Sequence, residues 1–329
     1  MTHRLTATTT AAILVIAAAV AFADEGPTVR MVDVDQGVQL ETLDWGGRGP
    51  DVVLLAGMGL SAHVYDGFAR RLAADYRVVG VTRRGFGAST HANGGYDPLT
   101  LARDVRRACD ALGIEQPILV GHSLAGTEMA FFASRYPGRA RGMVFLDAAY
   151  DHSLLEELEG LAPRPAVSAP GADDLRTPDA MLEWFRRTRG FLLPESELRS
   201  LYVFTEDGRL KDLNASPLAQ GLIMDALTPP PFGRVKAPAL AIFTKPTLAS
   251  QYPEHDDFAP DVLRAARRRV SVSRQLMSAA LATFEALCPQ AETVILDGAN
   301  HYLFLTRPTA VLQAVRAFLV SLPAPTAQP

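Results

Sequence analysis

Two hydrophobic patterns follow one another in the first third of the chain. Apolar and polar residues alternate in TVRMVDV (28–34) and VQLETLDW (38–45), with DQG between them. This period of two, broken by a tight turn, predicts an antiparallel β-hairpin. The later runs DVVLLAG and YRVVGV are continuously apolar, so we expect strands that are buried on both faces of a sheet.

Helical periodicity alternates with further apolar runs along most of the remaining chain. The fold class predicted is therefore α/β, with a mostly parallel sheet, helices on both faces and ligands bound at the carboxyl ends of the strands. We expect helices over 99–112, 124–135, about 261–287 and about 307–321, and strands over 117–121, 142–147, 239–243 and 293–296.

The alternation stops between Asp151 and about Arg234, where proline, acidic clusters and short amphipathic pieces are frequent. A structureless loop of that length is rare inside a compact domain. We therefore expect a mainly helical cap insertion over 151–234, between core segments 24–150 and 235–322. Its aromatic and leucine side chains either form an apolar lid face or pack its helices on their neighbours: Trp184, Phe185, Phe191 and Leu192.

The beginning of the chain has the layout of a secretory signal peptide. A polar start with Arg4 leads into an apolar run over 11–21, and Ala-Phe-Ala precedes Asp24. We expect cleavage near Ala23 and export to the periplasm or the extracellular space. The alternative is a retained anchor, although the apolar run is shorter than the ~20 residues of a spanning helix. The tail, 323–329, is expected to be disordered.

Composition removes several classes of function. With 32 basic and 36 acidic residues, the net charge of −4 does not suit binding to nucleic acid or to an anionic bilayer. Cys109 and Cys288 form no metal-binding spacing, and their α-carbon distance, which decides whether a disulfide forms, is not readable from sequence. Phosphate-binding glycine motifs are absent, so we expect no nucleotide cofactor. Because no CxxC or Cys/His spacing typical of a metal site occurs either, we expect no metal.

The segment GHSLAG, residues 121–126, lies between an apolar run and a helical pattern. Gly-x-Ser-x-Gly in a strand–turn–helix context is typical of a nucleophile elbow, where a sharp turn exposes the hydroxyl above the sheet. Ser123 is therefore the predicted nucleophile, at the amino end of a helix whose dipole favours negative charge. A chance match or a helix N-cap are the alternatives.

With this elbow in place, the chain resembles the α/β-hydrolase superfamily, in particular its serine hydrolase branch. The likeness rests on the order of four motifs: LLAGMG, where the family usually has a His-Gly turn, RRGFGAS, GHSLAG and the late GANHYLFL. It implies a predominantly eight-stranded sheet with a helical cap, and a Ser-His-acid triad.

The base and the acid follow from this resemblance and from strand ends. His301 follows the last expected strand, where the family has its catalytic histidine, and would exchange a proton with Ser123. His122 is expected to point away from the serine. No acid stands in TKPTLA, the usual position after ALAIF, so we assign the acid to Asp147 at the end of MVFLD. Other contenders are Glu254, Asp256 and Asp257 in a later loop, Asp151, and Asp297, which is more typical of a turn.

Two backbone N–H groups are expected to form the oxyanion hole. Leu124, directly after the nucleophile, supplies one, and Met58 in AGMG supplies the other by its family position. A serine nucleophile indicates acyl transfer to water, and an exported location favours a small-molecule ester or lactone as substrate. The alternatives are a non-hydrolytic enzyme of this fold, with cofactor-independent oxidative or lyase chemistry, or a catalytically silent binding protein.

Overall fold

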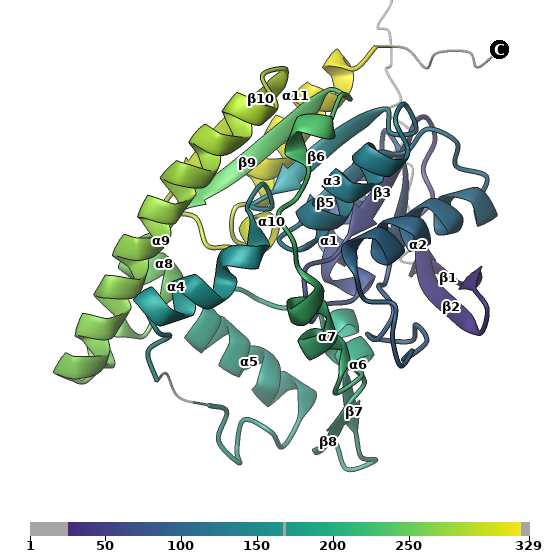
Figure 1. Ribbon diagram of the computed structural model, residues 1–329. Helices are drawn as coiled ribbons and strands as arrows, with labels where there is room; N and C mark the ends of the chain where they lie inside the picture. The colour runs from purple at the N-terminus through teal and green to yellow at the C-terminus, as the bar shows by residue number, and fades with distance from the viewer. Residues whose placement is uncertain (1–25, 167–168, 324–329) are drawn as a thin grey trace, which may run out of the picture.

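The computed structural model describes residues 26–166 and 169–323, so the predicted signal peptide and residues 324–329 of the predicted tail lie outside the described residues. Its main element is an eight-stranded sheet with the order β1-β2-β4-β3-β5-β6-β9-β10 (Figure 1). β1 and β2 form the expected antiparallel hairpin, β2 pairs antiparallel with β4, and all other neighbours are parallel. The strands are β1 (Thr28–Asp35), β2 (Val38–Asp44), β3 (Asp51–Leu55), β4 (Arg77–Val81), β5 (Ile118–His122), β6 (Gly142–Leu146), β9 (Ala239–Lys245) and β10 (Ala291–Asp297).

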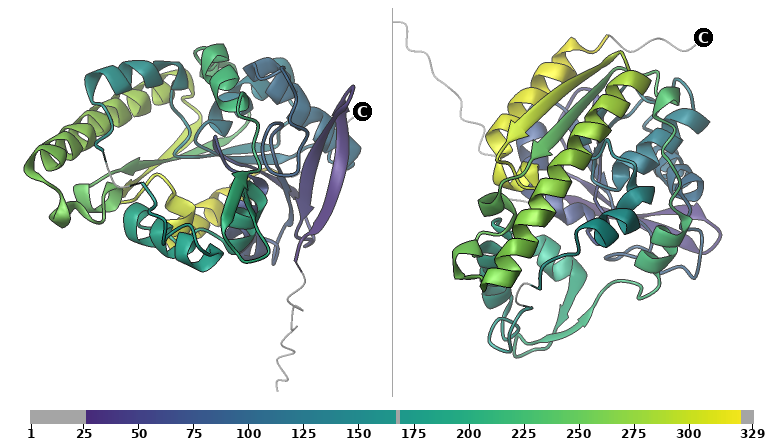
Figure 2. Two further views of the ribbon diagram at one scale, coloured as in Figure 1. Left: turned by 90° about the horizontal axis from the view of Figure 1, so that it is seen from below. Right: turned by 60° about the vertical axis from the view of Figure 1, so that its left-hand side comes forward.

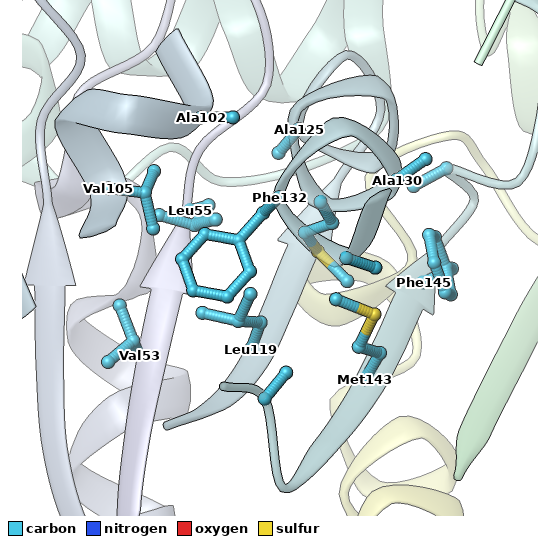
Figure 3. Packing of buried hydrophobic residues seen from close by; sticks show 14 of the residues in the cluster. Val53, Leu55, Ala102, Val105, Leu119, Ala125, Ala130, Phe132, Met143 and Phe145 are labelled. Atoms are coloured by element: carbon cyan, nitrogen blue, oxygen red, sulfur yellow. The ribbon is translucent and has the colours of Figure 1, made fainter. Parts of the chain in front are cut away.

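Helices cover both faces of this sheet, as Figure 2 (left) shows with the sheet seen from its edge. Side chains of successive strand residues point to opposite faces. In β3, Val53 and Leu55 therefore join the cluster on one side and Val52 and Leu54 the cluster on the other. On the first side, Phe132 of α3 packs among these strand residues (Figure 3). The covering helices are α1 (Asp66–Leu72), α2 (Pro98–Ala111), α3 (Ala125–Arg135), α9 (Pro260–Leu287), α10 (Leu303–Thr306) and α11 (Pro308–Ser321).

Between β6 and β9 the chain forms a group of short elements, which we call the cap segment (151–234). Figure 1 shows α4 to α7 gathered beyond the carboxyl ends of the parallel strands. The cap segment also holds a two-stranded sheet, β7–β8, that the pattern did not predict. Its elements are η2 (His152–Leu154), α4 (Leu155–Leu161), α5 (Pro178–Arg189), α6 (Glu195–Leu201), β7 (Tyr202–Phe204), β8 (Leu210–Leu213), α7 (Ala219–Ala226) and η3 (Phe232–Arg234).

The aromatic residues of the cap segment pack inward. Trp184 and Phe191 are buried, and Phe191 stacks on Tyr302 with ring centroids 4.3 Å apart. Phe185 packs against the core cluster that contains Phe191, whereas Leu192 is 63% exposed. The aromatic side chains thus attach the cap segment to the core, and Leu192 takes no part in this packing.

The described residues also bear on membrane spanning, cysteine pairing and metal binding. None of the described helices is both long and apolar enough to cross a membrane. Cys109 and Cys288 are both buried and both free thiols. Within 26–166 and 169–323, no three His, Cys, Asp or Glu side chains gather so that they could hold a metal ion.

A buried carboxyl group fastens α6 to the core. Glu197 is 0% exposed and accepts hydrogen bonds from the backbone N–H of Ser61, at 2.9 Å, and from its hydroxyl, at 2.5 Å. Ser61 directly precedes η1 (Ala62–Tyr65), in the loop after β3. Burial raises the pKa of Glu197 to about 8, against the lowering effect of the two Ser61 donors. The contact between cap and core therefore contains a group that titrates near neutral pH.

This raised pKa predicts that Glu197 makes stability depend on pH. An acid whose pKa is raised by folding binds its proton more tightly in the folded state, so its contribution is full below pH 4.5 and is lost as pH rises towards about 8. Glu197→Gln, which stays neutral, should therefore gain in melting temperature relative to wild type as pH rises across this window. Thermal unfolding of both proteins at a series of pH values checks this, and parallel curves would contradict it.

Candidate active site

Ser123 occupies a strained turn between β5 and α3. Its φ angle is +54°, in the left-handed region that non-glycine residues rarely adopt, and its N–H donates to the carbonyl of Leu146 at 3.2 Å. A Cβ atom at Gly126 would collide with the carbonyl oxygen of Ala148, and one at Gly121 with the sulfur of Met129. The two glycines therefore let α3 pack closely on the sheet directly after the serine.

Asp147 and His301 meet at the same edge of the sheet. Asp147 follows β6 directly, and His301 lies in the loop between β10 and α10. The Nδ1 atom of His301 is 2.6 Å from Oδ2 of the buried Asp147. Because an ionised carboxylate only accepts hydrogen bonds, the Nδ1–H of His301 is the donor, and Nε2 is left to accept a proton.

Three further donors hold the carboxylate of Asp147. Thr244 donates its backbone N–H and its hydroxyl, both at 2.9 Å, and the hydroxyl of Tyr150 donates at 2.8 Å. Burial and the charge of Asp147 raise the pKa of Tyr150 well above its usual value, so the phenol keeps its proton and remains a donor. This arrangement fixes the side chain that orients His301.

Thr244 and Tyr150 are not among the site residues predicted from the sequence. Thr244 directly follows the apolar run ALAIF, where the family resemblance led us to look for the acid. A residue with a hydroxyl group at position 244, next to a strand that is followed by Asp147, is the sequence signal that points to Thr244 as a donor to the acid. The strand that usually carries the acid supplies two hydrogen-bond donors to it instead.

Four of the other acids considered from the sequence are engaged elsewhere, and the fifth, Asp257, is exposed. Glu254 pairs with Arg187 at 2.8 Å, and Asp256 lies 3.5 Å from its neighbour His255. Asp151 caps η2 (His152–Leu154) through the N–H of Ser153, and Asp297 pairs with Lys245. Within the described parts of the chain, none of these acids hydrogen-bonds His301.

His122 links the elbow to the histidine loop. Its Nε2–H donates to the backbone carbonyl of His301 at 3.0 Å, and the two rings lie 4.5 Å apart, centre to centre. Burial, with a smaller effect from His301, lowers the pKa of His122 well below its usual value, so this ring is neutral. No hydrogen bond joins Ser123 to His301 in the described residues, and in ligand-free enzymes such bonds are often long and tighten with substrate.

The backbone around Met58 lies against the elbow. A Cβ atom at Gly57 would come within 2.8 Å of Nδ1 of His122 and 3.2 Å of Cβ of Ser123. Throughout 26–166 and 169–323, the amide N–H groups of Met58 and Leu124 have no protein acceptor. Two free donors beside the serine are what an oxyanion requires.

Comparison with known proteins shows the family of this chain. The model of the alpha/beta hydrolase fold family matches residues 50–229, which is more than half of the chain. The chain belongs to this family. The eight-stranded, mostly parallel sheet expected from the resemblance is thereby confirmed for this α/β hydrolase.

Similar proteins include hydrolases of several kinds. This α/β hydrolase is 26% identical over 274 residues to the 2-(acetamidomethylene)succinate hydrolase of Mesorhizobium japonicum, covering 83% of this chain and 89% of the relative. It is 25% identical to a pimeloyl-[acyl-carrier protein] methyl ester esterase of Aeromonas salmonicida, with shares of 83% and 96%. Identity to the bifunctional esterase/perhydrolase of Acinetobacter calcoaceticus is 36%, over 32% of this chain and 39% of the relative.

Solved structures share the fold at low sequence identity. The crystal structure of an E-2-(acetamidomethylene)succinate hydrolase has a TM-score of 0.70 at 23% identity, covering 90% of this chain and 100% of the other. The structure of the esterase RhEst1 from Rhodococcus has a TM-score of 0.60 at 20% identity, with shares of 90% and 99%. At these identities the likeness shows the fold alone.

Proposed function

We propose that this α/β hydrolase is a serine hydrolase that cleaves a carboxylic ester or lactone. The observation that carries the proposal is the hydrogen bond between His301 and Asp147, formed at the same sheet edge as the strained turn of Ser123. An imidazole oriented by a carboxylate at the same sheet edge as a serine is the arrangement that activates a serine.

The proposed reaction runs in two halves. His301 accepts the proton of Ser123 as the serine oxygen attacks the carbonyl carbon, and the N–H groups of Met58 and Leu124 stabilise the oxyanion. His301 then gives the proton to the leaving alcohol, and an acyl-enzyme remains. A water molecule, deprotonated by His301, attacks this acyl group, and His301 returns the proton to the oxygen of Ser123 as the acid is released. Asp147 keeps the histidine in the required tautomer and stabilises its charged form.

The relatives support ester cleavage as the reaction. Two of them carry esterase in their names. A third, similar over most of both chains, is named 2-(acetamidomethylene)succinate hydrolase, which supports hydrolysis without pointing to an ester. We favour a small or medium ester or lactone over an acyl-CoA because we also propose export. Support for export comes from the leader pattern of residues 1–23. N-terminal sequencing of the protein secreted from the full-length gene should find a start near Asp24.

Two assays test the proposed reaction. The purified protein should hydrolyse p-nitrophenyl acetate and butyrate, and a fluorophosphonate should add once, with peptide mapping placing the adduct on Ser123. The label requires an activated serine, so it also separates a hydrolase from a silent binding protein of this fold. Absence of both turnover and labelling over short and medium acyl chains would count against the proposal.

A further inference from the structure

A buried ion pair connects the elbow helix to the segment after β4. Arg83 contacts a carboxylate oxygen of Glu128 through Nε, and both side chains are at most 5% exposed. Arg83 lies in the motif RRGFGAS, and Glu128 lies in the first turn of α3, four residues after Leu124. A buried ion pair contributes little net stability compared with apolar packing, so its position needs a further reason.

The remaining nitrogens of Arg83 hold the loop that carries Met58. Nη1 donates to the carbonyl of Gly57 at 3.1 Å, and Nη2 donates to the carbonyl of Ala56 at 2.7 Å. The guanidinium is a rigid planar fork, so these two carbonyls are held in a fixed relation to Glu128. Arg83 thereby connects the Met58 loop to the helix behind the nucleophile.

Because of peptide geometry, the hydrogen bond from Arg83 to the carbonyl of Gly57 also affects the direction of the Met58 N–H. The carbonyl of Gly57 and the N–H of Met58 belong to one planar trans peptide group, in which they point in opposite directions. Holding the carbonyl of Gly57 on Arg83 therefore turns the N–H of Met58 away from the guanidinium. The same Gly57 lies against Ser123, and its carbonyl accepts hydrogen bonds from Arg83 at 3.1 Å and from the N–H of Leu60 at 3.4 Å.

We propose that Arg83 and Glu128 are positioning residues that set the spacing of the two oxyanion donors, the N–H groups of Met58 and Leu124. The inference rests on the proposed function. Neither side chain touches the substrate. Their effect falls on the transition state, because the donors must match an oxyanion that exists only there.

The chain offers a matched control in the adjacent residue. Arg84 forms an equally buried pair with Asp104 of α2, through bonds of 2.6 and 2.7 Å, and its third contact is the carbonyl of Gly94. In the described parts of the chain, no hydrogen bond joins this second pair to the Met58 loop or to α3, although burial and, to a smaller extent, the charge of the nearby Glu128 raise the pKa of Asp104. Loss of its charge tests what a buried ion pair contributes to folding alone.

The experiment compares Arg83→Lys and Glu128→Gln with Asp104→Asn in the full chain. For p-nitrophenyl butyrate we expect kcat to fall about 10²-fold in Arg83→Lys, because a lysine cannot hold both carbonyls, with KM within threefold of wild type. In the isosteric Glu128→Gln, kcat should fall by less than in Arg83→Lys, and KM should not change. Asp104→Asn should lower the melting temperature with kcat within threefold of wild type.

A transition-state analogue separates positioning from general damage. Phenylboronic acid forms a tetrahedral adduct with a serine oxygen, and the adduct carries an oxygen in the oxyanion position. Its affinity should fall in parallel with kcat/KM in Arg83→Lys and stay unchanged in Asp104→Asn. Wild-type kcat and boronate affinity in both test variants, or equal losses in Asp104→Asn, would overturn the inference while leaving the proposed function intact. An inactive, unlabelled wild type would overturn the proposed function and this inference with it.

Discussion

Replacing Ser123 by alanine is expected to lower kcat for p-nitrophenyl butyrate by about 10⁶-fold. Without the hydroxyl, no acyl-enzyme forms and His301 has no serine proton to accept. Any residual turnover would come from substrate binding and from the free N–H groups beside the elbow. Steady-state kinetics, together with intact mass after fluorophosphonate treatment, measure both the loss of turnover and the loss of the covalent adduct.

The elbow should survive this change. Alanine and serine both carry a Cβ atom, so the left-handed φ of residue 123 costs each of them a similar amount. Ser134→Ala, an exposed position on the same helix α3, is the matched control and should retain full activity and labelling. If Ser123→Ala keeps its fold and still turns over the ester at a rate near wild type, the proposed nucleophile is wrong.

Asp147→Asn should lower kcat by about 10⁴-fold with little change in the fold. An asparagine amide that donates to Nδ1 of His301 would stabilise the wrong tautomer, in which Nε2 carries the hydrogen and cannot accept the serine proton. The donors from Thr244 and Tyr150 remain and compete for the asparagine oxygen. Kinetics over a range of pH and thermal unfolding separate this electronic defect from a loss of stability.

The alternative acids provide the control for this assignment. Asp256→Asn and Asp257→Asn change the later loop, where Asp256 is 92% exposed and lies beside His255. Both variants should retain wild-type kcat. A large loss in either of them, combined with a near-normal rate in Asp147→Asn, would transfer the role of the acid to that loop.

The sheet and its helices were predictable because buried parallel strands must be apolar on both faces. The run PILVG predicts a strand over 117–121, and β5 spans Ile118–His122. The helix expected over 99–112 is α2 (Pro98–Ala111), whose N-cap Asp97 and following proline mark its beginning. The β7–β8 pair was not predictable in this way, because its three- and four-residue strands are largely exposed and carry no periodic apolar pattern.

The residues of the candidate site also differ in how far the sequence predicts them. Ser123 and Asp147 could be proposed as site residues because local signals mark them, namely a glycine-flanked serine and an acid at the end of an apolar run. Contacts between distant segments leave no such signal. The bond between Ser61 and Glu197 spans 136 positions, and the pair of Arg83 and Glu128 spans 45. Only the folded chain reveals which polar residues of different elements are buried together.

If Asp147, directly after β6, is the acid of the proposed triad, the segment after β9 has a different role. In the proposed triad, Ser123 and Asp147 follow adjacent strands, and β9 contributes only the donors of Thr244. In this arrangement, residues 246–258, which follow Thr244, have no catalytic role. Within that stretch, the carbonyl of Ser250 accepts a hydrogen bond from the side-chain amide of Asn300 at 2.8 Å, directly before His301. Insertions, deletions and exchanges that leave this bond in place should be tolerated by the proposed triad, so related enzymes with the same arrangement can diversify there.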